Sequence, residues 1–143
     1  MKGISKRKAI VMRSQGFSLL ELMITVAIVA ILATIAYASY QAQIVKSRRA
    51  AGASCLQERA QFMERFYTTT LTYEGAPAPP ACDAEVASYY TISFVAAPTA
   101  RAFTLQAAPQ GIQATRDTKC ATLTINQQGL RTVSGTGTEA DCW

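Results

Sequence analysis

An apolar run near the N-terminus restricts the possible folds of this chain more than any other feature. Residues 17–40 contain a single ionisable side chain, Glu21. As an α-helix, the run would be ~36 Å long at ~1.5 Å per residue. That length is sufficient to cross a bilayer hydrocarbon core of ~30 Å. We therefore expect a transmembrane helix, in which a carboxylate is costly enough that Glu21 requires a functional explanation.

The positive charge of the chain is concentrated before this run. The formal net charge is +5. Residues 1–16 contain five basic side chains and no acidic one, whereas the chain from Phe17 onward has nine of each sign. The basic excess is therefore not evidence for a nucleic-acid-binding domain. Positive charge before a membrane span instead predicts a cytoplasmic N-terminus and an exported C-terminal part.

The N-terminus allows three interpretations. In a secretory signal peptide, cleavage would follow Ala38, but residues 17–40 are longer than the usual apolar core of such a signal. A plain uncleaved anchor explains the length and leaves Glu21 unexplained. In the third interpretation, processing occurs at Gly16-Phe17, directly before the span. We favour the third, because it alone accounts for the glycine, the aromatic residue, the glutamate and the apolar run together.

The motif Gly16-Phe17-Ser18-Leu19-Leu20-Glu21, after a short basic leader, resembles the processing site of type IV prepilins. The resemblance implies that a prepilin peptidase cuts between Gly16 and Phe17 and methylates the new Phe17 terminus. It also implies that Glu21 pairs with the amino terminus of a neighbouring subunit during assembly. Family members commonly have a proline at the position of Ala38. Without it, nothing in the sequence requires a kink in the helix.

Helical periodicity continues beyond the span. Within residues 41–68, Leu56, Ala60, Met63 and Tyr67 are spaced to share one helix face, which we interpret as ordinary core. Residues 69–88 combine a threonine run, a glycine and several prolines and are expected to form a loop.

Period-two patterns follow in residues 89–133. Three segments alternate apolar and polar side chains and are expected to form strands, at residues 90–95, 103–107 and 121–126, and a short fourth strand is expected at residues 130–133. The fold class is therefore α+β. The resemblance implies the type IV pilin fold, in which a long N-terminal helix packs on a small antiparallel sheet of about four strands. We predict a leader (1–16), a transmembrane segment (17–40) and a periplasmic head (41–143).

Four cysteines occur without a CxxC motif and without any histidine. In an exported head they are expected to form two disulfides rather than a metal site. Four cysteines allow three connectivities, and the residues alone do not choose between them. We expect Cys55 to pair with Cys82. Pairing of Cys120 with Cys142 would match the disulfide-bounded C-terminal region of type IV pilins and tie down the otherwise unstructured tail, residues 134–143.

The chain lacks the residues of the common catalytic motifs, since it has no histidine, phosphate-binding glycine loop or nucleophile elbow. We predict no enzymatic activity and no cofactor. The segments from Thr115 to Asn126 and Asp141-Cys142-Trp143 are similar to PilE-type minor pilins. This resemblance implies a minor subunit of a type IV pilus, involved in filament assembly and in pilus-dependent motility or adhesion. It implies storage in the inner membrane, then export to the surface pilus, with other pilins, the prepilin peptidase and the assembly machinery as partners.

Two other functions share the leader and the helix. A DNA-uptake pilin would bind nucleic acid through a basic patch on the head, for which the candidates are Arg101, Arg116, Lys119 and Arg131. A pseudopilin of a type II secretion system is the other alternative, although the cysteine-bounded C-terminal segment resembles pilins more closely.

Overall fold

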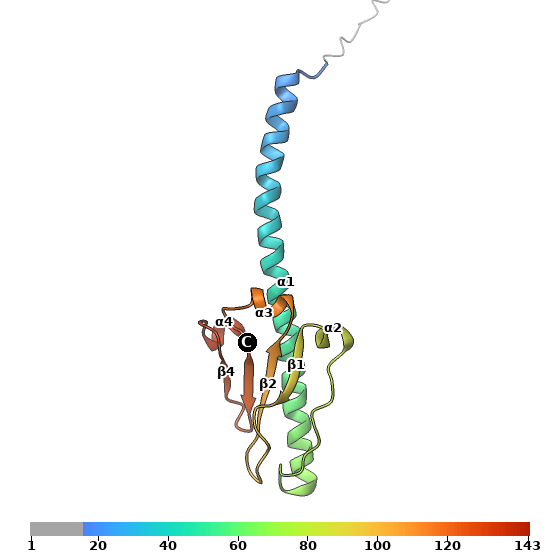
Figure 1. Ribbon diagram of the computed structural model, residues 1–143, viewed down its shortest axis with the longest axis vertical. Helices are drawn as coiled ribbons and strands as arrows, with labels where there is room; N and C mark the ends of the chain where they lie inside the picture. The colour runs from blue at the N-terminus through green and yellow to red at the C-terminus, as the bar shows by residue number, and fades with distance from the viewer. Residues whose placement is uncertain (1–15) are drawn as a thin grey trace, which may run out of the picture. The chain divides into compact units, whose positions relative to one another are not determined.

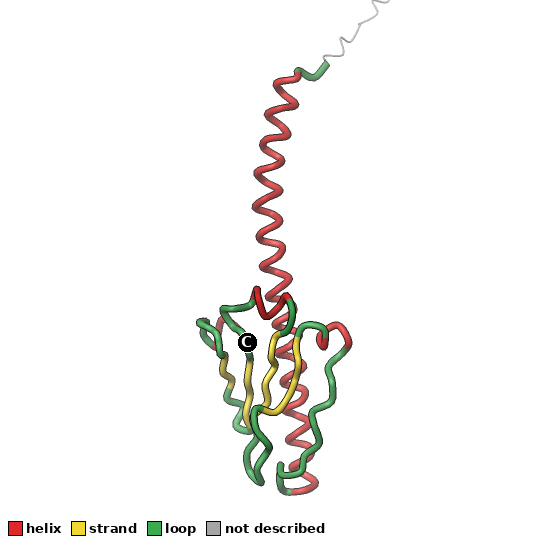
Figure 2. Tube along the Cα trace, viewed as in Figure 1, coloured by secondary structure: helices red, strands yellow, loops and turns green. Residues whose placement is uncertain are grey.

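The computed structural model describes residues 16–143, so most of the predicted leader lies outside the described residues. The chain divides into two units, the first ending at Ala38 and the second, the head, comprising Ser39–Trp143. The head consists of the second part of a long helix, a four-stranded sheet and three short helices. Figures 1 and 2 show how these elements are arranged. The predicted α+β fold class is confirmed.

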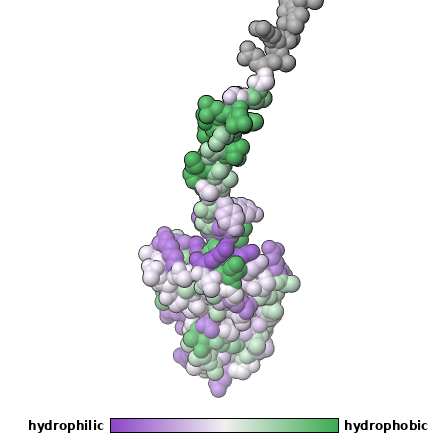
Figure 3. All heavy atoms as spheres, turned by 45° about the horizontal axis from the view of Figure 1, so that its top comes forward, coloured by the Kyte–Doolittle hydropathy of each residue, from purple (hydrophilic) through white to green (hydrophobic). Residues whose placement is uncertain are grey.

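Helix α1 (Leu19–Thr70) contains both the apolar run and the first part of the head. It has no proline, and its first glycine is Gly52, so its backbone hydrogen bonds are uninterrupted. The helix ends where Leu71 adopts a left-handed conformation with φ of 58°. Within the described residues, α1 is the one helix that is long and apolar enough to span a membrane. In Figure 3 the side chains of its N-terminal part are mainly hydrophobic.

The sheet has four antiparallel strands in the order β1-β2-β3-β4, so each strand pairs with the next one in the chain. The strands are β1 (Tyr90–Phe94), β2 (Thr104–Pro109), β3 (Leu123–Asn126) and β4 (Arg131–Val133). The predicted third strand included Ala121, which was wrong. Ala121 has a φ of 51°, a left-handed conformation that a strand does not contain, and β3 begins only at Leu123.

Three short helices were not predicted. They are α2 (Ala84–Ala87) in the expected loop 69–88, α3 (Ile112–Arg116) between β2 and β3, and α4 (Glu139–Cys142) in the tail. None exceeds five residues. A segment of this length completes at most one and a half turns, so it leaves no repeated hydrophobic spacing in the sequence.

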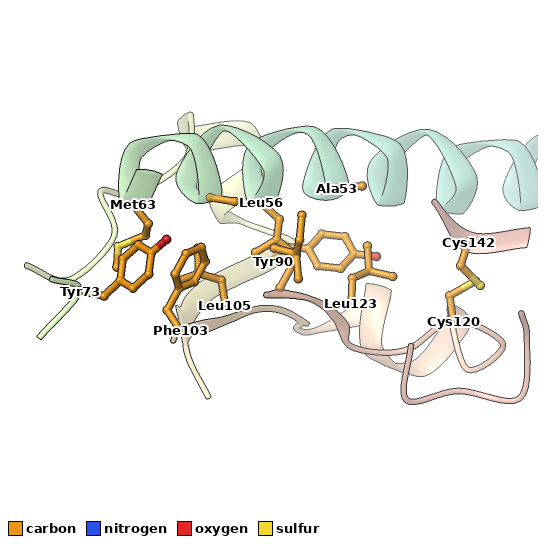
Figure 4. Close-up of a cluster of buried hydrophobic side chains, with 13 residues drawn as sticks. Ala53, Leu56, Met63, Tyr73, Tyr90, Phe103, Leu105, Cys120, Leu123 and Cys142 are labelled. Carbon is orange, nitrogen blue, oxygen red and sulfur yellow. A yellow bond between two sulfur atoms is a disulfide. The ribbon is translucent and has the colours of Figure 1, made fainter. Parts of the chain in front are cut away.

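The core of the head lies between α1 and one face of the sheet (Figure 4). Leu56 and Met63 of α1 are fully buried, as predicted from their spacing, while Tyr67 is only half-buried. On the sheet, Leu105 and Leu123 are fully buried. The predicted period-two alternation in β2 and β3 is therefore confirmed, since their apolar residues face the helix.

Gly52 allows the closest approach between α1 and the sheet. A Cβ atom at this position would lie 2.8 Å from Cδ2 of Tyr90, whose ring packs on the helix backbone. Glycine within a helix usually costs about 1 kcal/mol relative to alanine. Here the space for the tyrosine ring outweighs that cost.

We expect Gly52→Ala to destabilise the head by roughly 1–3 kcal/mol, as overpacking does elsewhere. In a Tyr90→Ala background, the same change should instead stabilise the protein, because the clash is removed and only helix propensity remains. Chemical denaturation of the four variants of this cycle measures the change of sign. A stabilising effect of Gly52→Ala in the parent chain would contradict the prediction.

Candidate functional site

The apolar part of α1 presents an almost continuous hydrophobic surface. Every residue from Leu19 to Tyr40 is exposed, and large apolar residues such as Ile24, Val29 and Leu32 are more than half exposed. Glu21 lies in the first turn of this helix. Gly16 and Phe17 precede the helix without regular structure. The unit therefore exposes a surface that requires lipid or other helices as its environment.

A buried polar cluster joins α1, β1 and α3 inside the head. Oδ1 of Asp117 accepts a hydrogen bond from Nη1 of Arg49 at 2.5 Å, and this ion pair is almost fully shielded from solvent. Oδ2 of Asp117 accepts hydrogen bonds from the Tyr90 hydroxyl at 3.0 Å and from Nε2 of Gln113 at 3.2 Å. Burial raises the pKa of the Tyr90 hydroxyl above its usual value, which keeps it protonated as a donor.

Gln113 extends this cluster to the backbone of α1. Its Nε2 also contacts the Val45 carbonyl oxygen at 3.1 Å and the Tyr90 hydroxyl at 3.1 Å. Gln113 is fully buried, which is unusual for glutamine. No sequence pattern predicts this cluster, because the paired residues are 68 positions apart and belong to no motif.

A second tyrosine is buried at the other end of the core. Tyr73 packs edge-on against Phe103, with ring centroids 4.9 Å apart, and its hydroxyl donates to Glu64 at 3.0 Å. Burial, reinforced by the Glu64 carboxylate, raises the pKa of Tyr73 to about 12. This contact fixes the segment that follows the end of α1.

Two disulfides cross-link parts of the head that are far apart in the sequence. Cys55 of α1 is bonded to Cys82, and Cys120 is bonded to Cys142 of α4, which are the two pairs expected from the sequence. The second bond holds the C-terminal tail. There, Gly135 and Gly137 donate backbone hydrogen bonds to the carbonyls of Cys120 and Lys119, and α4 closes the chain.

The four candidate DNA-contacting residues do not form one patch. Nζ of Lys119 lies 3.3 Å from the Asp141 carboxylate, and the Arg131 guanidinium lies 5.0 Å from the Trp143 ring, so both contact the C-terminal segment. Hydrogen bonds from Thr138 and the nearby Lys119 lower the pKa of Asp141.

The other two candidates are separated by the length of β2. Arg101 lies in the link before β2, beside Ala100, whose carbonyl accepts the Tyr73 backbone N–H. Arg116 lies on α3, after β2, where its guanidinium donates to the Gln41 side-chain oxygen. The structure therefore does not bring Arg101 together with Arg116, because Arg101 precedes β2 and Arg116 lies beyond its other end.

Among residues 16–143, no cluster of three or more potential metal ligands occurs. What the described residues present is an exposed apolar helix and a rigid, disulfide-bonded head.

Two known protein families match parts of the chain. Residues 38–124, more than half of the chain, match the family described as "Type IV minor pilin ComP, DNA uptake sequence receptor". Residues 11–37 match the prokaryotic N-terminal methylation motif. No curated protein matches.

Solved structures show the same fold. The non-core minor pilin PilV of Neisseria meningitidis is 24% identical, with a TM-score of 0.53, covering 70% of this chain and 94% of that one. A type IV pilin from Shewanella oneidensis is 29% identical, with a TM-score of 0.50, covering 69% and 97%.

The family match, the methylation motif and the exposed apolar helix lead to the same conclusion. The resemblance to type IV pilins seen in the sequence is confirmed, as is the predicted location. Pilins are structural subunits that associate with other pilins and with the pilus machinery. The chain belongs to the type IV minor pilin family and is anchored in the inner membrane before it is assembled into surface pili.

Proposed function

We propose that the chain enters the filament through the apolar part of α1, with Phe17 as its methylated amino terminus and Glu21 as its pairing group. The observation that carries this proposal is the exposed hydrophobic surface between Leu19 and Tyr40. In the membrane this surface faces lipid, and in a filament it faces neighbouring helices. The same residues can face lipid in the membrane and other helices in the filament, because lipid tails and the side chains of those helices are similarly apolar.

Processing is tested by mass spectrometry of the membrane-extracted protein. The proposal requires a chain that begins at N-methylated Phe17. An intact Met1, or a terminus near Ser39, would exclude prepilin processing.

Glu21→Gln is expected to leave membrane insertion intact and to reduce incorporation into pili by at least about ten-fold. The reason is that a buried amino terminus without a carboxylate partner costs roughly 3–5 kcal/mol. The amount of this subunit in sheared filaments, relative to membranes, gives the measurement. Glu58→Gln, at a carboxylate exposed on the head, is the matched control and should assemble normally. Normal incorporation of the Glu21→Gln variant would remove Glu21 from the mechanism.

DNA binding by the head is a second proposed function, supported by the match of residues 38–124 to a family described as a DNA uptake sequence receptor. Of the four candidate residues, Lys119 and Arg131 are the two that both contact the C-terminal segment, Lys119 at Asp141 and Arg131 at Trp143, so we assign the DNA contact to them. Phosphate contacts by such residues make binding strongly salt-dependent.

We expect the double variant Lys119→Gln/Arg131→Gln to weaken DNA binding by the full chain in detergent. The slope of log affinity against log salt should fall by roughly 2, because each phosphate that a basic side chain neutralises contributes about 0.9 to that slope. Arg101→Gln is the control, because Arg101 lies on the link before β2, away from α4. An unchanged slope in the double variant would exclude these two residues from a DNA interface.

A further inference from the structure

Helix α3 has an outward face that the pilin functions above do not use. Gln113 and Asp117 point into the head and are buried, whereas Ile112, Thr115 and Arg116 share the opposite, exposed side. We propose that this outer face of α3, defined by Ile112, Thr115 and Arg116, rests on anionic phospholipid headgroups while the subunit is stored in the inner membrane.

Three contacts fix α3 to the first turns of α1 inside the head. Gln113 contacts the carbonyl oxygen of Val45, and Asp117 is paired with Arg49. Arg116 donates to the side-chain oxygen of Gln41. Gln41, Val45 and Arg49 are spaced by four, so α3 lies along one face of α1, beginning at the first residue after Tyr40.

The position of Gln41 brings α3 close to the membrane surface. The apolar run ends at Tyr40, a residue that is 64% exposed, and tyrosine is enriched where transmembrane helices leave the hydrocarbon core. With a rise of ~1.5 Å per residue, Gln41 lies within a few ångströms of that boundary. The guanidinium that contacts Gln41 is then at headgroup level. Within the head, Figure 1 shows α3 at one end of the sheet and the β1–β2 link at the other, so that link is remote from α3.

The chemistry of the face fits an anionic phosphate surface. Among the described residues, Arg116 forms no ion pair, and its partner Gln41 is neutral, so its charge is uncompensated. A guanidinium binds phosphate oxygens in a bidentate manner. Ile112, half exposed beside it, supplies an apolar side chain of the kind that enters the interface between headgroups and acyl chains. Continuity with the membrane span favours lipid over a separate protein partner.

The test uses the full chain in lipid nanodiscs and its tryptophan fluorescence. The sequence contains one tryptophan, so the Trp143→Phe variant has no tryptophan fluorescence of its own. Ile112→Trp then reports from α3, and Val95→Trp, at an exposed position on the β1–β2 link, is the matched control. Lipids brominated on the upper acyl chain quench only a tryptophan that touches the membrane.

We expect quenching at position 112 to exceed that at position 95 by roughly two-fold or more, and to be greater in phosphatidylglycerol than in phosphatidylcholine nanodiscs. Arg116→Gln should remove the difference between the two lipids, whereas Arg65→Gln, on the far part of α1, should keep it. Equal quenching at the two positions, or quenching at 112 that does not depend on anionic lipid, would overturn the proposal. Because a single subunit per nanodisc suffices, the result is independent of filament assembly.

Discussion

Replacing Asp117 with alanine is expected to lower the free energy of unfolding of the head by about 3–5 kcal/mol. The carboxylate is 1% exposed and accepts hydrogen bonds from Arg49, Tyr90 and Gln113. Its removal leaves the Arg49 guanidinium, itself only 11% exposed, without a countercharge. The donors of Tyr90 and Gln113 also lose an acceptor, and desolvated donors without partners are costly.

Denaturant titration of the full chain in detergent, followed by fluorescence of Trp143, measures this loss. Glu58→Ala is the control, because the Glu58 carboxylate is 64% exposed and lies 3.9 Å from its basic neighbour, so its removal should change stability little. Equal effects of the two substitutions would contradict the assignment of a buried ion pair. The double variant Arg49→Met/Asp117→Leu should recover part of the loss, since apolar residues of similar volume often replace a buried pair without cost.

Replacing both Cys120 and Cys142 with alanine is the second change for which we expect a large effect, about 3 kcal/mol from loop-closure entropy. This bond joins residues 22 positions apart and encloses β3 and β4, half of the sheet. Without it, the tail retains its backbone contacts to Cys120 and Lys119, the exposed ion pair between Lys119 and Asp141, and the short helix α4. A four-residue helix does not persist alone, so α4 should unfold.

Hydrogen exchange of the C-terminal amides, together with denaturation, distinguishes the effects of removing the two disulfides. The Cys55→Ala/Cys82→Ala variant is the comparison, because its separation of 27 positions predicts a similar entropic loss. That loop contains no strand, so exchange in β3 and β4 should remain slow. Retained protection of α4 in the Cys120/Cys142 double variant would show that the disulfide does not hold the tail.

Much of the fold follows from local patterns. The long helix, the four short strands and the buried faces of β2 and β3 were predicted from periodicities of 3.6 and 2, because each element repeats its spacing over several residues. The processing motif was equally visible, since Gly16, Phe17 and Glu21 are close together in the chain. The short helices α2, α3 and α4 were missed because one turn produces no repeat.

The N-terminal motif and the long apolar run were enough to identify a pilin, because membrane insertion and processing depend on contiguous residues. The role of Gly52, the burial of Gln113 and the partnership of Arg49 with Asp117 depend instead on groups 38 to 68 positions apart, which no local pattern connects. The same holds for the separation of Arg101 from Arg116. Arginines that look alike in the sequence acquired different surroundings only when the sheet packed on α1: Arg49 lies in a buried ion pair, whereas Arg101 lies on an exposed link.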